Sequence, residues 1–210
     1  MLARAWVAAS EGALAEAIAL AKQAAGVATQ RGQPAHEVLS LHTAVCFGDR
    51  TVTGRLSQLA GTVDGPRAPL GVAHAAALAA DDGDGLRAAS VGLEQMGDLL
   101  AAADAAAQAS ITYARRERKG AALAAVSRAN RLAEACEGAR TPALVLAARP
   151  LPLTVREREI VTLAAHELSN RQIADRLVVS VRTVEGHLYR AGAKLGTVSR
   201  AELGALLRGD

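Results

Sequence analysis

The first 148 residues alternate between apolar, Ala-rich runs and short breaks rich in Gly, Asp and Pro. The runs are about 10 to 18 residues long, the usual length of a globular helix, and none shows the strict alternation of a half-buried strand. The pattern therefore predicts helical hairpins without strands. The breaks lie at Gly12, 32–34, 48–49, Gly54, 61–69, 81–85, 97–98 and Gly120.

The predicted helices show a weak internal repeat. Similar Gly-led segments carry leucines separated by 42, 30 and 37 residues, namely Leu14, Leu56, Leu86 and Leu123. The mean separation is near the 34-residue period of tetratricopeptide repeats, and small Ala side chains allow the two helices of a hairpin to approach closely. The sequence predicts a repeat-like helical domain over residues 1–137. The Trp, Tyr and Pro positions of that repeat are mostly absent, so an irregular helical bundle stays an alternative.

Residues 138–152 interrupt the helical pattern with Pro142, Pro150 and Pro152. Proline lacks an amide hydrogen and disfavours helix at the preceding residue. We expect a linker here, followed by a second domain over residues 153–210. Within the linker, residues 144–148 are compatible with a short helix that packs on one of the two neighbouring domains.

Helix-start patterns are frequent after residue 153. Three capping boxes pair a hydroxyl residue with Glu or Gln three positions later, and they predict helices that begin near residues 155, 170 and 200. Ser180 supplies a further cap before Val181. The boxes are Thr154 with Glu157, Ser169 with Gln172, and Ser199 with Glu202.

Each of these four predicted helices has one apolar face at helical spacing. The faces comprise Ile160, Leu163 and Ala164; Ile173, Ala174 and Leu177; Val181, Val184, Leu188, Ala191 and Leu195; and Leu203, Leu206 and Leu207. Only residues 178–180 separate the second helix from the third, and such a short turn between two helices is typical of a helix-turn-helix.

The opposite face of the predicted helix 181–195 is polar. If its apolar face is buried, Arg182, Glu185, Gly186, Tyr189 and Arg190 point outward with the spacing of a face that fits a DNA major groove. Gly186 costs about 1 kcal/mol relative to Ala inside a helix. Its presence indicates either close approach to DNA or drift at a tolerant surface position.

These motifs resemble the C-terminal DNA-binding domain of LuxR-type transcription regulators. The resemblance rests on LTVRE at 153–157, SNRQIA at 169–174, LVVSVRTVEGH at 177–187, KLG at 194–196 and SRAEL at 199–203. It covers about 60 residues, implies an all-α, four-helix DNA-binding domain, and departs from the family pattern at Glu185, Gly186 and Gly192.

The resemblance implies roles for individual residues. Helix starts and cations would contact phosphate, namely Thr154, Asn170, Arg171, Ser180, Arg182, Thr183, His187, Arg190 and Lys194. Base recognition would fall to Glu185, Gly186 and Tyr189. The alternative is that these residues have structural roles. The hydroxyl residues would then mainly cap helices, His187 would be a half-buried residue at the edge of the domain, and Glu157 would stabilise the fold.

In this family the last helix often forms the dimer contact, which would place Leu203 and Leu207 in a homodimer interface. The alternative is that these leucines close the core of their own domain. A dimer that reads two half-sites would strengthen two weak contacts.

Composition narrows the remaining possibilities. Ala supplies 50 residues, and Trp, Tyr and Phe together supply four, which favours helix. Residues 1–148 hold 14 basic and 14 acidic residues, whereas residues 149–210 hold 10 and 7, so the excess charge lies where DNA binding is expected. Without an apolar run long enough to span a membrane or a secretory leader, we expect a cytoplasmic protein. Cys46 and Cys136 lack metal-ligand spacing and are predicted to be small buried residues in a reducing compartment, so neither a disulfide nor a metal site is expected.

Other function classes have less support. The five His are scattered and no nucleophile has a neighbouring base, so no enzyme activity and no cofactor is predicted. The alternation of strands typical of a receiver domain and an aromatic-lined pocket for a small lactone are both missing. Residues 1–137 instead resemble the helical repeats of large MalT-like regulators, although no GxxxxGK[ST] motif of their ATPase unit occurs. The chain is either a fragment or a short relative without that switch. The runner-up is a repeat scaffold that binds a protein or ligand, with a subordinate DNA-binding module.

Overall fold

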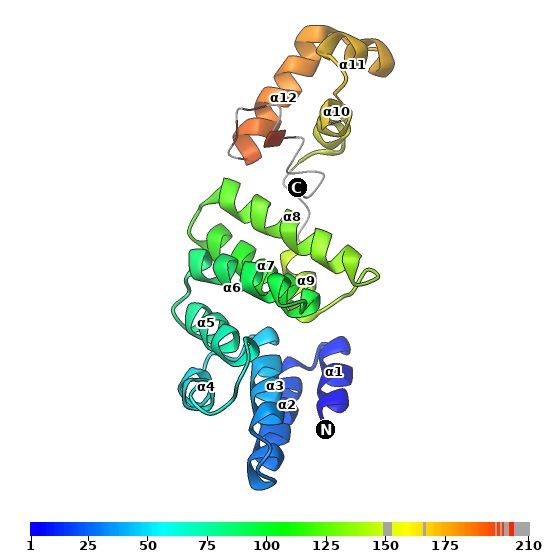
Figure 1. Cartoon of the computed structure of the whole chain (residues 1–210). Coiled ribbons are helices and arrows are strands. Elements are labelled where there is room, and N and C mark those ends of the chain that lie inside the picture. Colours follow the sequence, from blue (N-terminus) through cyan, green and yellow to red (C-terminus); the bar gives the residue numbers. More distant parts are fainter. Residues whose placement is uncertain (149–152, 166, 196, 198, 200–201, 204–210) are drawn as a thin grey trace.

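The computed structural model describes residues 1–148, 153–165, 167–195, 197, 199 and 202–203, and every regular element in these ranges is an α-helix. The predicted all-α class is therefore confirmed (Figure 1). The helices are α1 (Leu2–Ser10), α2 (Leu14–Gln30), α3 (Pro34–Cys46), α4 (Thr53–Ala60), α5 (Arg67–Ala79), α6 (Gly83–Gln95), α7 (Leu99–Arg115), α8 (Lys119–Ala135), α9 (Pro142–Ala147), α10 (Val155–Ala165), α11 (Asn170–Leu177) and α12 (Val181–Leu195).

Consecutive helices from α1 to α8 lie against one another and stack along one direction (Figure 1). Six of the turns between them share one geometry, in which a residue with positive φ is followed by an amide that donates to the carbonyl five residues back. This Schellman arrangement ends a helix and reverses the chain within three residues. The bonds, all 2.9 Å long, are Ala13 N to Ala8 O, Gln33 N to Ala28 O, Asp49 N to Ala44 O, Asp82 N to Ala77 O, Asp98 N to Leu93 O, and Arg118 N to Tyr113 O.

Most of the predicted breaks separate helices, but two do not. Gly54 and Gly120 lie in the first turns of α4 and α8, where a glycine costs less than in a helix interior. The break before α8 is instead formed by Glu117, which adopts the left-handed conformation with φ 57°. The four repeated leucines all lie in the second helix of a hairpin, in α2, α4, α6 and α8.

Close helix approach defines the core of the N-terminal part. On α7 the alanines Ala102, Ala103, Ala105, Ala107 and Ala109 are completely buried. Glycine serves the same purpose at a contact between α5 and α6, where a Cβ at position 92 would lie 2.4 Å from Leu70 Cδ2. Because these side chains are short, the helix backbones come close together and the packing stays dense.

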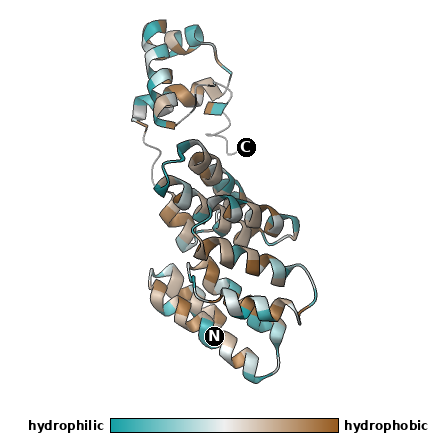
Figure 2. Cartoon of the chain, turned by 90° about the vertical axis from the view of Figure 1, so that its left-hand side faces the viewer, coloured by the Kyte–Doolittle hydropathy of each residue, from teal (hydrophilic) through white to brown (hydrophobic). Residues whose placement is uncertain are grey.

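Apolar and hydrophilic residues are distributed unevenly between the two parts of the chain. Figure 2 shows apolar stretches along the stacked N-terminal helices and more hydrophilic residues on α11 and α12. No helix in the described ranges is both long and apolar enough to cross a membrane.

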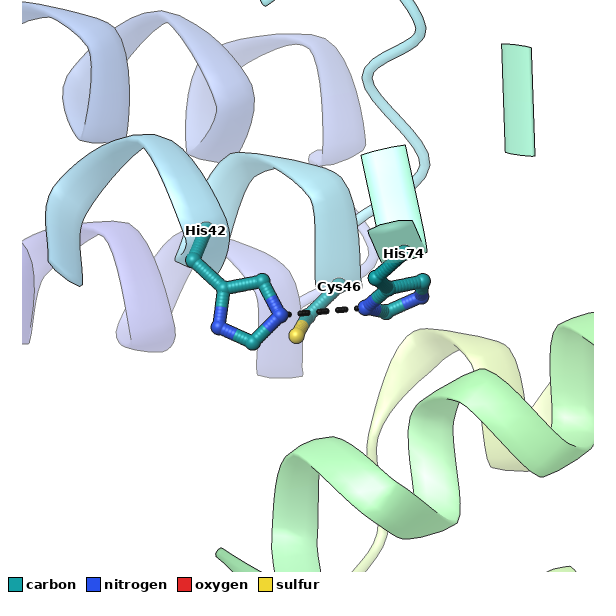
Figure 3. Close-up of side chains that lie close together, drawn as sticks. All are labelled: His42, Cys46 and His74. Atoms are coloured by element: carbon teal, nitrogen blue, oxygen red, sulfur yellow. Dashed lines mark hydrogen bonds between the residues drawn. The ribbon is translucent and has the colours of Figure 1, made fainter. Parts of the chain in front are cut away.

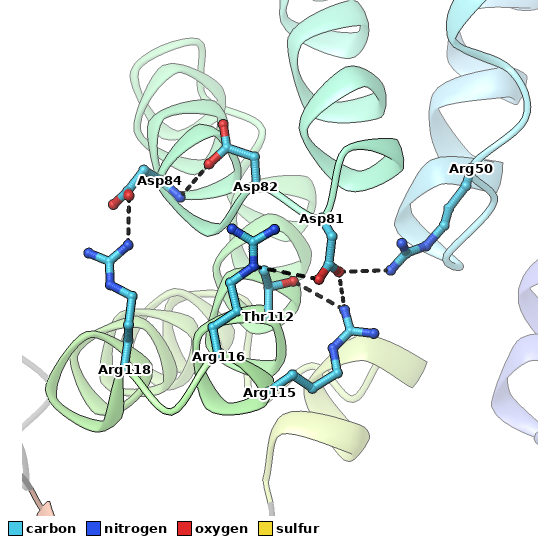
Figure 4. A network of polar contacts seen from close by, with 8 residues as sticks. All are labelled: Arg50, Asp81, Asp82, Asp84, Thr112, Arg115, Arg116 and Arg118. Carbon is cyan, nitrogen blue, oxygen red and sulfur yellow. Dashed lines mark hydrogen bonds and ion pairs between the residues drawn. The ribbon is translucent and has the colours of Figure 1, made fainter.

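Ion pairs link the turns of successive hairpins (Figure 4). Asp81, in the turn between α5 and α6, accepts from Arg50 and Arg115, and Arg116 Nε lies 3.9 Å away. Two turns thereby meet the end of α7. The backbone of Asp81 has φ 54°, a conformation that is rare for non-glycine residues. The neighbouring cations stabilise the carboxylate of this turn residue.

The C-terminal part meets the stack through α8 and the segment after it. Leu123 of α8 packs with Val161, Ala191, Leu195 and Leu203 in one buried cluster. The predicted short helix in the linker is present as α9, which packs mainly on α7.

Cys46 is 5% exposed, as expected for a buried thiol, whereas Cys136 is only half-buried, so the prediction for Cys136 was wrong. Cys136 follows α8 as its C-cap and therefore lies at a helix end that remains partly open to solvent.

Asp98 offers a test of the hairpin turns. Its Oδ1 accepts from Ala101 N at 3.1 Å and its Oδ2 bonds Arg67, so one side chain caps α7 and ties it to α5. We expect Asp98→Ala to lower the free energy of unfolding by about 1 to 2 kcal/mol, measured by urea unfolding followed by circular dichroism. Asp64→Ala is the matched control, since Asp64 is exposed and should change stability by less than about 0.5 kcal/mol. Equal effects of the two substitutions would contradict the assignment.

Candidate nucleic-acid interface

The two helices α11 and α12 are joined by residues 178–180, as the sequence predicts for a helix-turn-helix. Val178 adopts the left-handed conformation (φ 53°, ψ 51°), and Val179 N donates to Ala174 O at 3.0 Å, which closes the end of α11. Ala174 is 3% exposed, so a small residue sits where the helices meet. The turn is tight because the helix ends and reverses without spare residues.

Capping interactions fix where α10, α11 and α12 begin. Thr154 N donates to Glu157 Oε2 and Glu157 N donates to Thr154 Oγ1, and Ser169 forms the same reciprocal pair with Gln172. Ser180 accepts from Thr183 N at 3.0 Å. Two predicted capping boxes and the fourth cap are therefore confirmed.

For the last predicted helix, Glu202 N donates to Ser199 Oγ at 3.4 Å, and only residues 202–203 of that helix are described. Leu203 is 4% exposed and packs with Leu195 and Val161, so its side chain contributes to the core of this chain. Leu207, the other predicted dimer contact, lies outside the described residues.

The buried face of α12 positions its polar face. Val184, Ala191 and Leu195 are completely buried, against α10 and α11 or beside Leu123, and Leu188 is half-buried. Val181 was expected on this buried face and is instead 39% exposed, because it occupies the first position of the helix before the contact begins.

The polar face of α12 points to solvent over two turns. Arg182 and Glu185 are exposed, and Tyr189 is 78% exposed. Gly186 lies between them, and a Cβ there would meet no atom of the chain within 4 Å. Packing within the protein therefore does not require glycine at this position.

Glu157 holds α12 against α10. Its carboxylate is 2% exposed and accepts from Lys194 Nζ at 2.6 Å and from Thr154 N at 2.8 Å. The Lys194 bond, together with the Thr154 amide, lowers the pKa of Glu157 to about 2. Glu157 is thus both a capping partner and a brace, and Lys194 is engaged inside the domain.

The other predicted contact residues lie on or beside the exposed surface. Arg190 is exposed, with Nη2 3.1 Å from His187 Nδ1 and Nε 4.0 Å from Glu157 Oε1. His187 is half-buried. The remaining residues lie at the three helix starts: Thr154, Arg171, Ser180 and Thr183 are exposed, and Asn170 is half-buried.

Arg156 is a positioning residue that the sequence reading did not single out. Its Nη2 donates to Leu177 O at 3.0 Å and its Nη1 pairs with Glu159 Oε2 at 2.8 Å. It thereby satisfies a carbonyl at the end of α11 and fixes α11 relative to α10. The RE pair at 156–157 is part of the family motif, but the motif alone does not show which carbonyl the guanidinium reaches.

Packing within the domain explains the glycine at position 192, where the sequence departs from the family pattern. A Cβ at this position would lie 2.4 Å from Thr197 O, and Thr197 N donates to Gly192 O at 3.0 Å. Thr197 therefore lies directly over this glycine. Gly192 is therefore buried and belongs to the packing of the domain, while Gly186 faces solvent.

Comparison with known proteins supports this geometry. Residues 151–206 match the family model described as bacterial regulatory proteins, luxR family. A 51-residue stretch, 24% of this chain, is 53% identical to the HTH-type transcriptional regulators Mb0914c of Mycobacterium bovis and Rv0890c of Mycobacterium tuberculosis. The same length is 47% identical to the oxygen regulatory protein NreC of Staphylococcus aureus. The matched stretch spans 6% of each mycobacterial relative and 24% of NreC, and no solved structure matches the chain.

The Glu157 brace predicts a pH dependence. A carboxyl whose pKa is lowered on folding stabilises the folded state above its unfolded pKa, and this contribution is lost as pH falls from about 5 towards 2. We expect Glu157→Gln to cost about 2 kcal/mol at pH 7 and to converge with the unsubstituted protein near pH 2, as measured by urea unfolding. Glu185→Gln, on the exposed face of α12, should leave the profile unchanged. A Glu157→Gln difference that stays constant over this pH range would contradict the role.

The two glycines of α12 form a matched pair. We expect Gly192→Ala to lower stability by about 1 to 3 kcal/mol because the new methyl group meets backbone. Gly186→Ala should raise stability by up to about 1 kcal/mol because it gains helix propensity in open space. Thermal unfolding of both variants checks this, and the reverse order would refute the packing described for Gly192.

Proposed function

Because residues 151–206 match the luxR family model, we propose that the chain is a DNA-binding transcriptional regulator that inserts α12 into the DNA major groove. The observation that carries this proposal is the division of α12 into an apolar face buried at Val184, Ala191 and Leu195 and an opposite face on which Arg182, Glu185 and Tyr189 are exposed. In this proposal the chain is not an enzyme.

The proposed base contacts come from the exposed face of α12. Glu185 has a carboxylate that accepts from cytosine N4, and Tyr189 has a hydroxyl and a ring that contact base edges or a thymine methyl. Gly186 lies between them, and the absence of a side chain allows the helix backbone to approach the bases.

The proposed phosphate contacts surround this face. In the described part of the chain, Arg171 and Arg182 form no ion pair, so their charges remain available for phosphates. Thr154, Asn170, Ser180 and Thr183 lie at the starts of α10, α11 and α12, where amides and hydroxyls are suited to phosphate oxygens. Arg190 and His187 add further phosphate contacts along α12 in this proposal. In this proposal Lys194 affects DNA binding without contacting DNA. Its hydrogen bond to Glu157 fixes the orientation of α12.

We propose that two copies bind DNA together. One domain with a small charge excess binds weakly, and linkage of two domains raises the affinity without new contacts. Since Leu203 packs inside its own chain, the proposed homodimer contact falls mainly on other residues of the C-terminal segment, with Leu207 as the remaining candidate.

We further propose that residues 1–137 form tetratricopeptide-like repeats, joined by residues 138–152 to the DNA-binding domain over 153–210. Support comes from the left-handed turn residues Gly48, Asp81 and Glu117, which are separated by 33 and 36 residues. The repeats would carry a protein or ligand partner. The alternative, a repeat scaffold with a subordinate DNA-binding module, predicts weak DNA binding that no variant of α12 changes.

The function is tested by selecting bound duplexes from a random DNA pool with the full chain, followed by fluorescence anisotropy on the selected duplex. We expect Arg182→Ala and Tyr189→Ala each to weaken binding by about tenfold or more. Gly186→Ala should weaken binding although it stabilises the fold, because its methyl group would face the DNA. Arg31→Ala, an exposed substitution at the end of α2, is the matched control and should bind as the unsubstituted protein does.

Failure of the folded chain to enrich any duplex at low salt would overturn the proposal. Affinity that is unchanged in all three α12 variants would instead move the interface away from α12. The salt dependence supplies a third readout. Each lost phosphate contact reduces the magnitude of the negative slope of log K against log salt by about 0.9.

A further inference from the structure

Three side chains of metal-ligand type meet in the interior of the helical stack (Figure 3). His42 and Cys46 lie one turn apart on α3, and His74 lies on the neighbouring helix α5. One ring nitrogen of each histidine and Cys46 Sγ all lie within 4.8 Å of one another. The exposed fractions are 2% for His42, 5% for Cys46 and 0% for His74, so all three are withdrawn from solvent.

The hydrogen bonds around His74 determine which of its nitrogens carries the proton. Gln108 Nε2 donates to Val45 O and Cys46 O, which orients the amide so that Gln108 Oε1 must accept. The 2.7 Å contact of His74 Nε2 with Gln108 Oε1 is therefore a donation from the ring. His74 Nδ1 is then left with its lone pair directed at His42 Nε2, 3.1 Å away.

This arrangement has the features of a metal-binding histidine pair. A histidine that binds a metal usually donates its other ring nitrogen to a fixed acceptor, which is the part that Gln108 plays for His74. Two nitrogens at 2.0 to 2.1 Å from a tetrahedral zinc ion would be about 3.3 Å apart, close to the observed 3.1 Å. Burial of both rings favours their neutral form, which is the form that binds metals.

Asp104 supplies an independent observation beside this cluster. Its side chain is completely buried, its Oδ1 accepts from Thr141, and its Oδ2 has no hydrogen-bond partner among the described residues. It is close enough to Cys46 to raise the pKa of that thiol beyond the effect of burial. A buried carboxylate that no Lys or Arg of the described chain neutralises is unfavourable without a cation or a proton.

We propose that His42, Cys46 and His74 bind one Zn²⁺ ion, with the carboxylate of Asp104, beside Cys46, as a candidate for the fourth ligand. Nitrogen and sulfur ligands suit zinc, and in a buried site the charges of a thiolate and a carboxylate balance those of the divalent ion. On zinc binding the ring proton of His42 would move from Nε2 to Nδ1, so that the ring stays neutral, and the proton of the thiol would leave to solvent. Metal bonds would then replace the hydrogen bond that joins the two helices.

A cavity lies beside the cluster. A space of about 170 Å³ is lined by Cys46 and Gln108 on the inner side and by Arg50 and Arg115 towards the surface. Cys46 therefore borders a cavity next to the cluster. The site would join α3 to α5, two helices of successive hairpins, and thereby fix their separation.

The test uses the purified full chain, stripped with a chelator and dialysed, in a competition for Zn²⁺ with a chromophoric chelator. We expect one tightly bound Zn²⁺ per chain. Cys46→Ser and His74→Gln should each weaken binding at least tenfold, with circular dichroism to confirm that the variants are folded. Cys136→Ser and His36→Gln are the matched controls, since Cys136 is the other described thiol and His36 is exposed, and both should bind as the unsubstituted chain does.

Co²⁺ supplies a spectroscopic readout that begins with the unsubstituted chain. The unsubstituted chain loaded with Co²⁺ should show the thiolate charge-transfer band and the intense visible bands of a tetrahedral site. Loss of the charge-transfer band in Cys46→Ser and its retention in Cys136→Ser would support the proposal. A folded chain that binds no stoichiometric Zn²⁺, or a cobalt band that survives in Cys46→Ser, would overturn it.

Discussion

Close approach of helix backbones is the constraint on which the N-terminal part of this protein depends. A core made mainly of alanine fills space only when the helices are nearer than leucine-rich helices would be. The completely buried alanines of α7 and the contact of Gly92 with Leu70 show this directly. Short, geometrically similar turns follow from the same constraint, because a longer loop would not hold neighbouring helices at that distance. The same closeness brings His42, His74 and Gln108 within hydrogen-bond reach.

The C-terminal helices solve a different problem with different residues. They are short and polar on one side, and Ile160, Ile173 and Val184 provide a compact core for α10, α11 and α12. A core of this size leaves the orientation of α12 dependent on polar contacts. Glu157 with Lys194, and Arg156 with the carbonyl of Leu177, supply these contacts from a single helix start. The recognition surface in our proposal is thus set by residues that point away from it.

Sequence reasoning predicted the parts of the fold that depend on local chemistry. The capping hydroxyls at Thr154, Ser169 and Ser180 act within one turn, so their partners could be named from spacing alone. The burial of Val184 and the exposure of Tyr189 likewise follow from helical periodicity. The prediction that Val181 is buried was wrong, because helical periodicity does not show where along a helix the contact with neighbouring helices begins.

Long-range contacts were beyond the sequence. The packing of Gly192 against Thr197 depends on how the chain returns after α12, and no local pattern encodes that path. The histidines looked scattered because His42 and His74 are 32 residues apart, although the one-turn spacing of His42 and Cys46 was readable as a pair on one helix face. When repeats of about 34 residues stack, residues one repeat apart become neighbours. The repeat period could therefore have predicted that His42 and His74 lie close together.

Leu123 belongs to two structural units at once. It is part of α8 in the helical stack, and its side chain is buried with Val161, Ala191 and Leu195 of the C-terminal helices. If α8 tilts, either α12 moves with it or the side chain of Leu123 becomes exposed to water. Exposure of this side chain costs roughly 1.5 to 3 kcal/mol. The helical stack and the C-terminal helices are thus joined by this side chain as well as by the backbone.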